Sequence, residues 1–162
     1  MHSITALIVN SAYDDRAATE WDVSAVALDG GLWLFHLSHY WTAYQQARRG
    51  TTGTLDVPSR FPPVFPREAV VTDLAGALTG AEQPTFALVM TDYFGGAGDQ
   101  WACAYQAGRP VPGADDINSA LRVLGVRAAA GRDEFDTVGL GAHRSPPGYL
   151  DRYEDLCDEL GV

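Results

Sequence analysis

Several stretches of the chain are apolar over the length of a β-strand. Residues 3–10 are apolar and rich in β-branched side chains, which predicts a buried strand. Two apolar runs within 23–37 flank Asp29-Gly30-Gly31, a sequence that favours a tight hairpin turn. Residues 84–94 are apolar on both faces over most of their length, as in a central strand. In 101–108 the alanines favour a helix, but their alternation with large side chains favours a strand, which we predict.

Four further segments have apolar residues at helical spacing. They begin at serine, proline or aspartate, which are favoured at helix starts, and each is closed by a glycine. The segments are 38–50, 66–80, 115–125 and 145–161. In the second of them, Pro66 suits the first helical turn.

The remaining segments have no clear period. Residues 11–22 are polar and ambiguous, 51–66 contain four prolines and are expected to form a loop, and 127–144 are expected to be loop with one short element. The order of the elements predicts one α+β domain over residues 1–162. We expect a mainly antiparallel sheet built from β-hairpins, with about four helices packed on it.

Composition places the chain among globular proteins. Hydrophobic residues make up 46% and charged residues 20% of the 162 positions, and no apolar run has the length of a membrane span. The first residues lack the basic region of a signal peptide, so we expect a cytoplasmic protein. Cys103 and Cys157 fit no metal or redox spacing, and we expect both to be reduced and buried.

The net charge of −10 limits the partners that the chain can bind. An acidic surface repels nucleic acid and anionic membranes, so we expect neither as a partner. It suits a protein partner with a basic surface, although charge can also serve solubility alone. All eleven basic residues are arginine, which with abundant alanine and glycine indicates a GC-rich bacterial genome. The sequence assigns no oligomeric state.

Negative charge is concentrated at the C-terminal end. Residues 133–162 contain eight acids and only two arginines. Asp158 and Glu159 lie in the last predicted helical turn, where they oppose the helix dipole. Two interpretations remain open: a solvated helix face, or a surface kept for a cationic partner. The residues of the predicted partner surface are Asp151, Glu154, Asp155, Asp158 and Glu159.

The least common stretch of the sequence is TDYFGGAGDQW, residues 91–101. Gly95, Gly96 and Gly98 have the look of a phosphate-binding loop, but no Lys-Ser/Thr pair follows them. The carboxylates of Asp92 and Asp99 would also repel an anion. We therefore predict the turn of a β-hairpin.

Asp92 is the residue in this stretch that needs an explanation. On a strand it shares a face with Leu88 and Met90, so an apolar face ends in a carboxylate that requires a partner. One interpretation makes it a hydrogen-bond anchor for the loop. The other makes it a general acid or base, with His143 assisting. In that case the residues that bind substrate would be Tyr93, Gln100 and the backbone amides of the glycine loop.

Other chemistry has weaker support. His36 and His39 have H-x-x-H spacing, and His143 with Asp133, Glu134 or Asp136 would be needed to complete a metal site. No spacing requires that grouping, and no nucleophile motif is present, so we predict neither metal nor cofactor.

Three hypotheses about function follow. The first is a small acidic binding protein, of the immunity or antitoxin type, that inhibits a basic partner enzyme. The second is a small enzyme, a hydrolase or transferase, that uses Asp92 beside the glycine loop. The third is a subunit or scaffold of a larger assembly.

Overall fold

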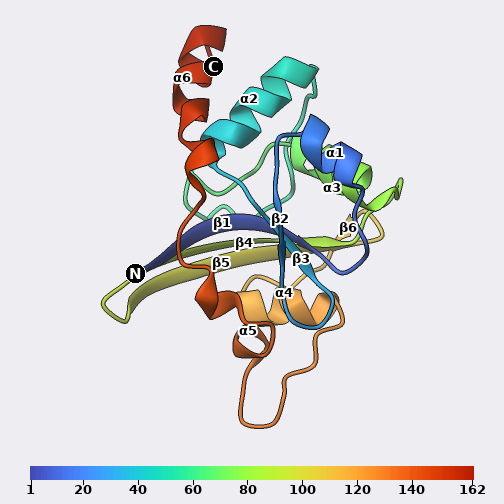
Figure 1. The fold of residues 1–162 in the computed structure, drawn as a ribbon, viewed down its shortest axis with the longest axis vertical. Coiled ribbons are helices and arrows are strands. Elements are labelled where there is room, and N and C mark those ends of the chain that lie inside the picture. The colour runs from blue at the N-terminus through green and yellow to red at the C-terminus, as the bar shows by residue number, and fades with distance from the viewer.

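The computed structural model describes residues 1–162, and its centre is one antiparallel sheet of six strands (Figure 1). The strands lie in the order β2-β3-β1-β4-β5-β6, and every neighbouring pair is antiparallel. Their bounds are β1 His2–Val9, β2 Ala25–Ala27, β3 Trp33–His36, β4 Phe86–Phe94, β5 Ala97–Gln106 and β6 Arg109–Pro110. The predicted α+β fold class is confirmed.

Six α-helices and two short 3-10 turns complete the structure. The helices are α1 Asp15–Glu20, α2 His39–Arg49, α3 Val70–Thr79, α4 Ile117–Val123, α5 Glu134–Thr137 and α6 Arg152–Leu160. The 3-10 turns are Leu140–Ala142 and Gly148–Leu150. No helix has both the length and the apolar character that a membrane span requires.

The helices cover both faces of the sheet. Figure 1 shows α1, α2, α3 and α6 on one side and α4 and α5 on the other. Strand residues alternate between two cores: Leu7 and Phe35 pack under α1, α2 and α3, whereas Ile8 and Leu34 pack against α4 and α5. Strand β4 is buried on both faces from Phe86 to Val89, as predicted for a central strand, whereas its end is more exposed.

Several local predictions are confirmed. Residues 101–106 of the predicted strand 101–108 belong to strand β5, and the Asp29-Gly30-Gly31 turn joins β2 to β3. The Ser38 hydroxyl accepts the N–H of Trp41 at 3.0 Å and caps α2. Cys103 and Cys157 are both free and buried.

The structure differs from prediction in three elements. Helix α3 begins at Val70 rather than near Pro66, α6 begins at Arg152 rather than near Ser145, and α1 falls in 11–22, a segment left without an assigned element. Helix α5 lies in 127–144, where one short element was expected. The late start of α3 has a visible cause. Glu68 pairs with Thr54 as an isolated β-bridge, and the Arg67 guanidinium donates to the carbonyls of Phe61 and Pro62, both at 2.8 Å.

Candidate functional site

The glycine-rich stretch forms the turn of the β4–β5 hairpin, as predicted. Gly95 and Gly96 are the two turn residues, with φ angles of 60° and 80° that match a tight hairpin turn. Gly98 lies opposite Tyr93, where a Cβ atom would overlap the carbonyl oxygen of Asp92. All three glycines are needed to close the hairpin, and a strand rather than a helix follows them.

Asp92 is exposed near the end of this hairpin and makes no side-chain hydrogen bond. It lies opposite Asp99, on the sheet face that also carries Met90 and Trp101. The interpretation of Asp92 as a buried anchor of the loop is wrong. The hairpin extends past the helices that cover the sheet, so the apolar face has reached solvent before Asp92.

The proposed helper of Asp92, His143, is not joined to it by any hydrogen bond or ion pair. His143 is half-buried and lies close enough to His36 to influence its titration. Neither Asp92 nor His143 lines the two clefts described below. The geometry therefore gives this pair no shared concave site.

The H-x-x-H histidines lie on opposite sides of the sheet. His36 follows Leu34 on the α4 face, whereas His39 lies at the start of α2 on the other face. The His39 ring lies beside that of Tyr40, with centroids 4.0 Å apart and planes inclined by 36°. No group of three or more His, Cys, Asp or Glu residues is placed to hold a metal ion. His36 is buried and its Nδ1 has no partner.

A cleft of about 400 Å³ lies between the hairpin and the α4–α5 layer. We call it the hairpin cleft. Its lining residues are Met1, His2, Tyr93, Gly95, Gly96, Gln100, Asn118, Asp133, Phe135, Gly141 and Arg144. It brings together four residues of the predicted substrate loop, Tyr93, Gly95, Gly96 and Gln100, and it also contains Asp133, which the sequence named only as a candidate metal ligand. The sequence marked Arg144 only within His143-Arg144-Ser145, a stretch that could hold a phosphate or begin the last helix, and it did not point to Asn118 of α4 or Phe135 of α5.

Gln100 fixes the hairpin side of this cleft. Its amide nitrogen donates to the Tyr93 hydroxyl at 3.2 Å, and its carbonyl oxygen accepts the N–H of Ile117 at 3.0 Å. The same side chain therefore holds Tyr93 in place and ties the hairpin to the first residue of α4.

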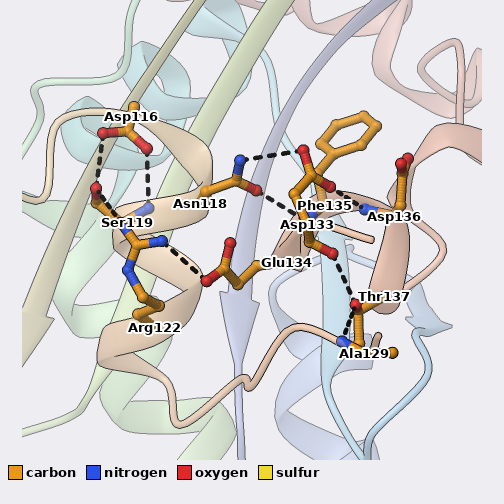
Figure 2. Close-up of polar contacts among 10 residues, drawn as sticks. All are labelled: Asp116, Asn118, Ser119, Arg122, Ala129, Asp133, Glu134, Phe135, Asp136 and Thr137. Carbon is orange, nitrogen blue, oxygen red and sulfur yellow. Dashed lines mark hydrogen bonds and ion pairs between the residues drawn. The ribbon is translucent and has the colours of Figure 1, made fainter. Parts of the chain in front are cut away.

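Figure 2 shows the opposite wall of the hairpin cleft, where α4 and α5 are joined by side-chain hydrogen bonds. Asn118 donates to the Asp133 carboxylate at 3.2 Å and accepts the N–H of Phe135 at 2.8 Å. Asp133 also caps α5 by accepting the N–H of Asp136 at 2.8 Å. These bonds orient Asn118, Asp133 and Phe135 before any ligand arrives.

Two further acids of this layer are neutralised within the fold (Figure 2). Arg122 pairs with Glu134 at 2.8 Å, and this hydrogen bond lowers the pKa of the Glu134 carboxyl. Burial alone would raise the pKa of Asp116, but hydrogen bonds from Ser119 outweigh it and lower that pKa. The acids of residues 115–137 therefore serve largely as caps and ion pairs.

The floor of the hairpin cleft is held by a hydrogen-bonded chain through His2. Thr91 Oγ1 accepts the N–H of Ile4 at 3.1 Å and lies 2.7 Å from His2 Nδ1, while His2 Nε2 lies 3.1 Å from the carbonyl oxygen of Leu140. Because a carbonyl only accepts, Nε2 carries the proton and Nδ1 accepts from the Thr91 hydroxyl. The ring of His2 is thus fixed, with its centroid 5.6 Å from that of Phe135.

The C-terminal acids form a stripe on α6 and the turn before it. Their spacing places them on one side of the helix, opposite the apolar stripe of Tyr153, Leu156 and Cys157 that packs inward. We call this stripe the acidic face. Its members, all exposed, are Asp151, Glu154, Asp155, Asp158 and Glu159.

No arginine neutralises the acidic face. The three ion pairs of the structure are Arg60–Asp115, Arg122–Glu134 and Arg152–Asp22, and none includes a member of this face. The one side-chain bond to the face comes from the Tyr40 hydroxyl, which donates to Glu154 at 3.2 Å and whose pKa that bond raises.

A second cleft, of about 420 Å³, borders the acidic face, and we call it the α6 cleft. Apolar side chains, among them Leu37, Val64 and Met90, line part of it, and Asp151 and Glu154 lie at its rim. Val64 is exposed to solvent there. Apolar surface and uncompensated negative charge thus adjoin each other.

Sequence reasoning missed Asp22, which connects the start of the chain to α6. Its carboxylate accepts from both Arg152 and the Tyr153 hydroxyl, although its φ of 55° is unusual for a residue other than glycine. No local pattern marks this role, because its partners lie about 130 positions away.

Comparison with protein-family models, with curated proteins and with solved structures finds no match for this chain.

Proposed function

We propose that the protein is a small acidic inhibitor of the immunity or antitoxin type, which captures a basic partner enzyme through its acidic face. The observation that carries this proposal is that none of the five exposed carboxylates of the acidic face forms an ion pair with an arginine; Arg152, the arginine of α6 itself, pairs with Asp22 instead. Elsewhere in the chain, Asp22, Asp115 and Glu134 are each paired with an arginine. Other acids, such as Asp56 and Glu82, are unpaired as well, but they do not lie together on one side of a helix. A surface that excludes such compensation is suited to a cationic partner.

The placement of two of these acids adds support. Asp158 and Glu159 lie in the last turn of α6, where each opposes the helix dipole at a cost of about 0.3–1 kcal/mol. Glutamine or arginine at either position would favour the helix more. A binding role accounts for acids retained at an unfavourable position.

The α6 cleft supplies the apolar contacts that a charged surface alone does not provide. Charged rims mainly accelerate encounter, whereas desolvated apolar contacts supply most of the affinity in protein interfaces. Val64 and Met90 offer such contacts next to Asp151 and Glu154. We infer that a partner covers the α6 cleft and the acidic face together.

The proposal is tested by reversing four charges of the acidic face. The tagged protein, produced in cells that encode it, is expected to retain one basic protein in stoichiometric amount and to inhibit its activity. Lysine at Asp151, Asp155, Asp158 and Glu159 is expected to abolish capture and inhibition, and added salt is expected to weaken capture by the unchanged protein.

A matched control reverses the same number of charges elsewhere. Its sites are Asp56, Glu82, Asp99 and Asp136, which are exposed and make no side-chain hydrogen bond. This variant has the same net charge as the first, so capture that survives only in the control locates the partner on α6. Capture that survives in both variants would reject the proposal. Circular dichroism verifies that both remain folded.

A further inference from the structure

We propose that the hairpin cleft is a binding site for a small anionic ligand, one that carries a carboxylate or phosphate group on a planar apolar body. This inference concerns a different surface from the acidic face and does not depend on the proposed inhibitor function. The volume of the hairpin cleft, about 400 Å³, lies within the range of about 300–1,000 Å³ that is usual for small-molecule sites.

The cleft presents hydrogen-bond donors that nothing in the fold occupies. Arg144 takes part in no ion pair, and its Nε alone is engaged, with the carbonyl of Gly141 at 3.3 Å. The backbone N–H groups of Gly95 and Gly96 have no acceptor. Tyr93 accepts a bond from Gln100, so its own hydroxyl proton remains available. A guanidinium with two adjacent backbone N–H groups is chemistry that recognises anions.

The carboxylates near this cleft do not oppose an anion as strongly as the sequence suggested. Asp92 and Asp99 lie on the strand positions that face the α6 side of the sheet, whereas Tyr93 and Gln100 face the cleft. Asp133 is the only acid in the lining. Both of its oxygens already accept hydrogen bonds, from Asn118 and from the N–H of Asp136.

An apolar wall sets the shape of the rest of the ligand. The ring of Phe135 lines the cleft beside the ring of His2. Hydrogen bonds hold the His2 ring and the backbone N–H of Phe135 in place. Tyr93 adds a third ring on the hairpin side. Aromatic side chains at this spacing favour a flat apolar group.

The site is organised in advance of binding. The side-chain amides of Gln100 and Asn118 each bond on both their nitrogen and oxygen ends, so they position the walls. A ligand therefore pays little ordering cost for this part of the protein. Arg144, which is exposed, is the charged side chain of the lining that remains to be ordered.

The test is an NMR titration of the whole protein with benzoate and with phenyl phosphate, and with benzyl alcohol as the uncharged comparison. Saturable shifts are expected at the amides of Gly95, Gly96 and Asn118 for one or both anions, with much weaker ones for benzyl alcohol. Arg144→Gln is expected to weaken anion binding about tenfold. Arg132→Gln, which changes an exposed arginine outside the cleft, is expected to leave it unchanged.

Three results would overturn the site. They are shifts that do not saturate, equal affinities in the Arg144→Gln and Arg132→Gln variants, or equal affinities for benzoate and benzyl alcohol. The four-lysine variant of the acidic face is expected to bind the anions at least as well as the unchanged protein, so failure of one proposal is separable from failure of the other.

Discussion

His36 is the only histidine that lies in a core, and its burial disfavours the protonated imidazole. It is about 5% exposed, and its Nδ1 has no hydrogen-bond partner. Burial, with a smaller contribution from His143, lowers the pKa of its imidazole from 6.5 to about 4. The folded protein therefore holds this ring neutral under conditions in which the unfolded chain protonates it.

The consequence is a loss of stability on mild acidification. Above pH 6.5 the ring is neutral in both states and has no effect. As the pH falls from 6.5 to about 4, His36 becomes protonated in the unfolded state but stays neutral in the folded state, so the free energy of unfolding decreases. The full effect is at most about 3 kcal/mol. Urea unfolding across this range measures it, and His36→Leu is expected to flatten the dependence.

The matched control is His39→Gln, which removes a half-buried histidine from the opposite side of the sheet. It is expected to keep the pH dependence of the unchanged protein. Glu134 and Asp116, whose pKa values are lowered, lose their stabilising effect at more acidic pH and do so in every variant. A His36→Leu protein with an unchanged slope between pH 6.5 and about 5 would contradict the assignment.

Among the elements, the turn between β5 and β6 contains an avoidable strain. Gln106 pairs with Arg109, so Ala107 and Gly108 are the two turn residues. Both have positive φ, 50° and 77°, which glycine adopts freely and alanine does not. Asn-Gly is the sequence best suited to such a turn, because asparagine tolerates the left-handed region.

Ala107→Asn is therefore expected to stabilise the protein by about 0.5–1 kcal/mol. For a chain of this size that corresponds to an increase in Tm of about 1–4 °C. The backbone N–H of Ala107 donates to Thr85 at 3.0 Å, and an exposed side chain leaves that bond intact. Thermal unfolding is the measurement. Ala97→Asn, at a strand position of the neighbouring hairpin, is expected to give no gain; a gain in both would indicate another cause.

The elements that sequence could predict are those whose signal is local. Ser38 and Gly50 bound α2, and alternation identified β5 despite its alanines. Helix α1 is too short to show a helical period in the sequence. Its N-cap, Asp14, is also a common loop residue, and only the structure shows that Trp21 at the end of this helix is buried. The start of α3 depends on bonds from Arg67 to the preceding loop and on the bridge between Glu68 and Thr54, which helical spacing does not reveal.

At the scale of the molecule, whether a candidate site residue is buried or exposed depends on how far the helices extend over each face of the sheet. Asp92 follows an apolar face in the sequence, but whether that face is covered at its end is decided by the length of the helices above it. The acidic face was predictable because helical spacing alone groups its residues. The hairpin cleft was predictable mainly on the hairpin side, since Asn118 and Phe135 come from later segments that no local pattern connects with the hairpin.

The net charge of −10 also has a cost for the whole fold. Like charges repel more in the compact state than in the expanded chain, so salt that screens them is expected to raise the Tm. The screening length falls from about 30 Å at 0.01 M to about 3 Å at 1 M. Within the acidic face, neighbouring carboxylates without arginine partners should account for a large part of this repulsion.

Neutralising that face tests the argument. Asn at Asp151, Asp155 and Asp158 with Gln at Glu159 is expected to raise the Tm at low salt and to reduce its increase with NaCl. Two of the four substitutions also remove the unfavourable charges at the end of α6, each worth about 0.3–1 kcal/mol.

The control places amides at four dispersed acids, Asp56, Glu82, Asp99 and Asp136, and removes the same net charge. They are expected to change the salt response less, because repulsion depends on distance. Equal salt responses in the two variants would mean that the acidic face imposes no special cost, and its lack of compensating arginines would then support a partner less strongly.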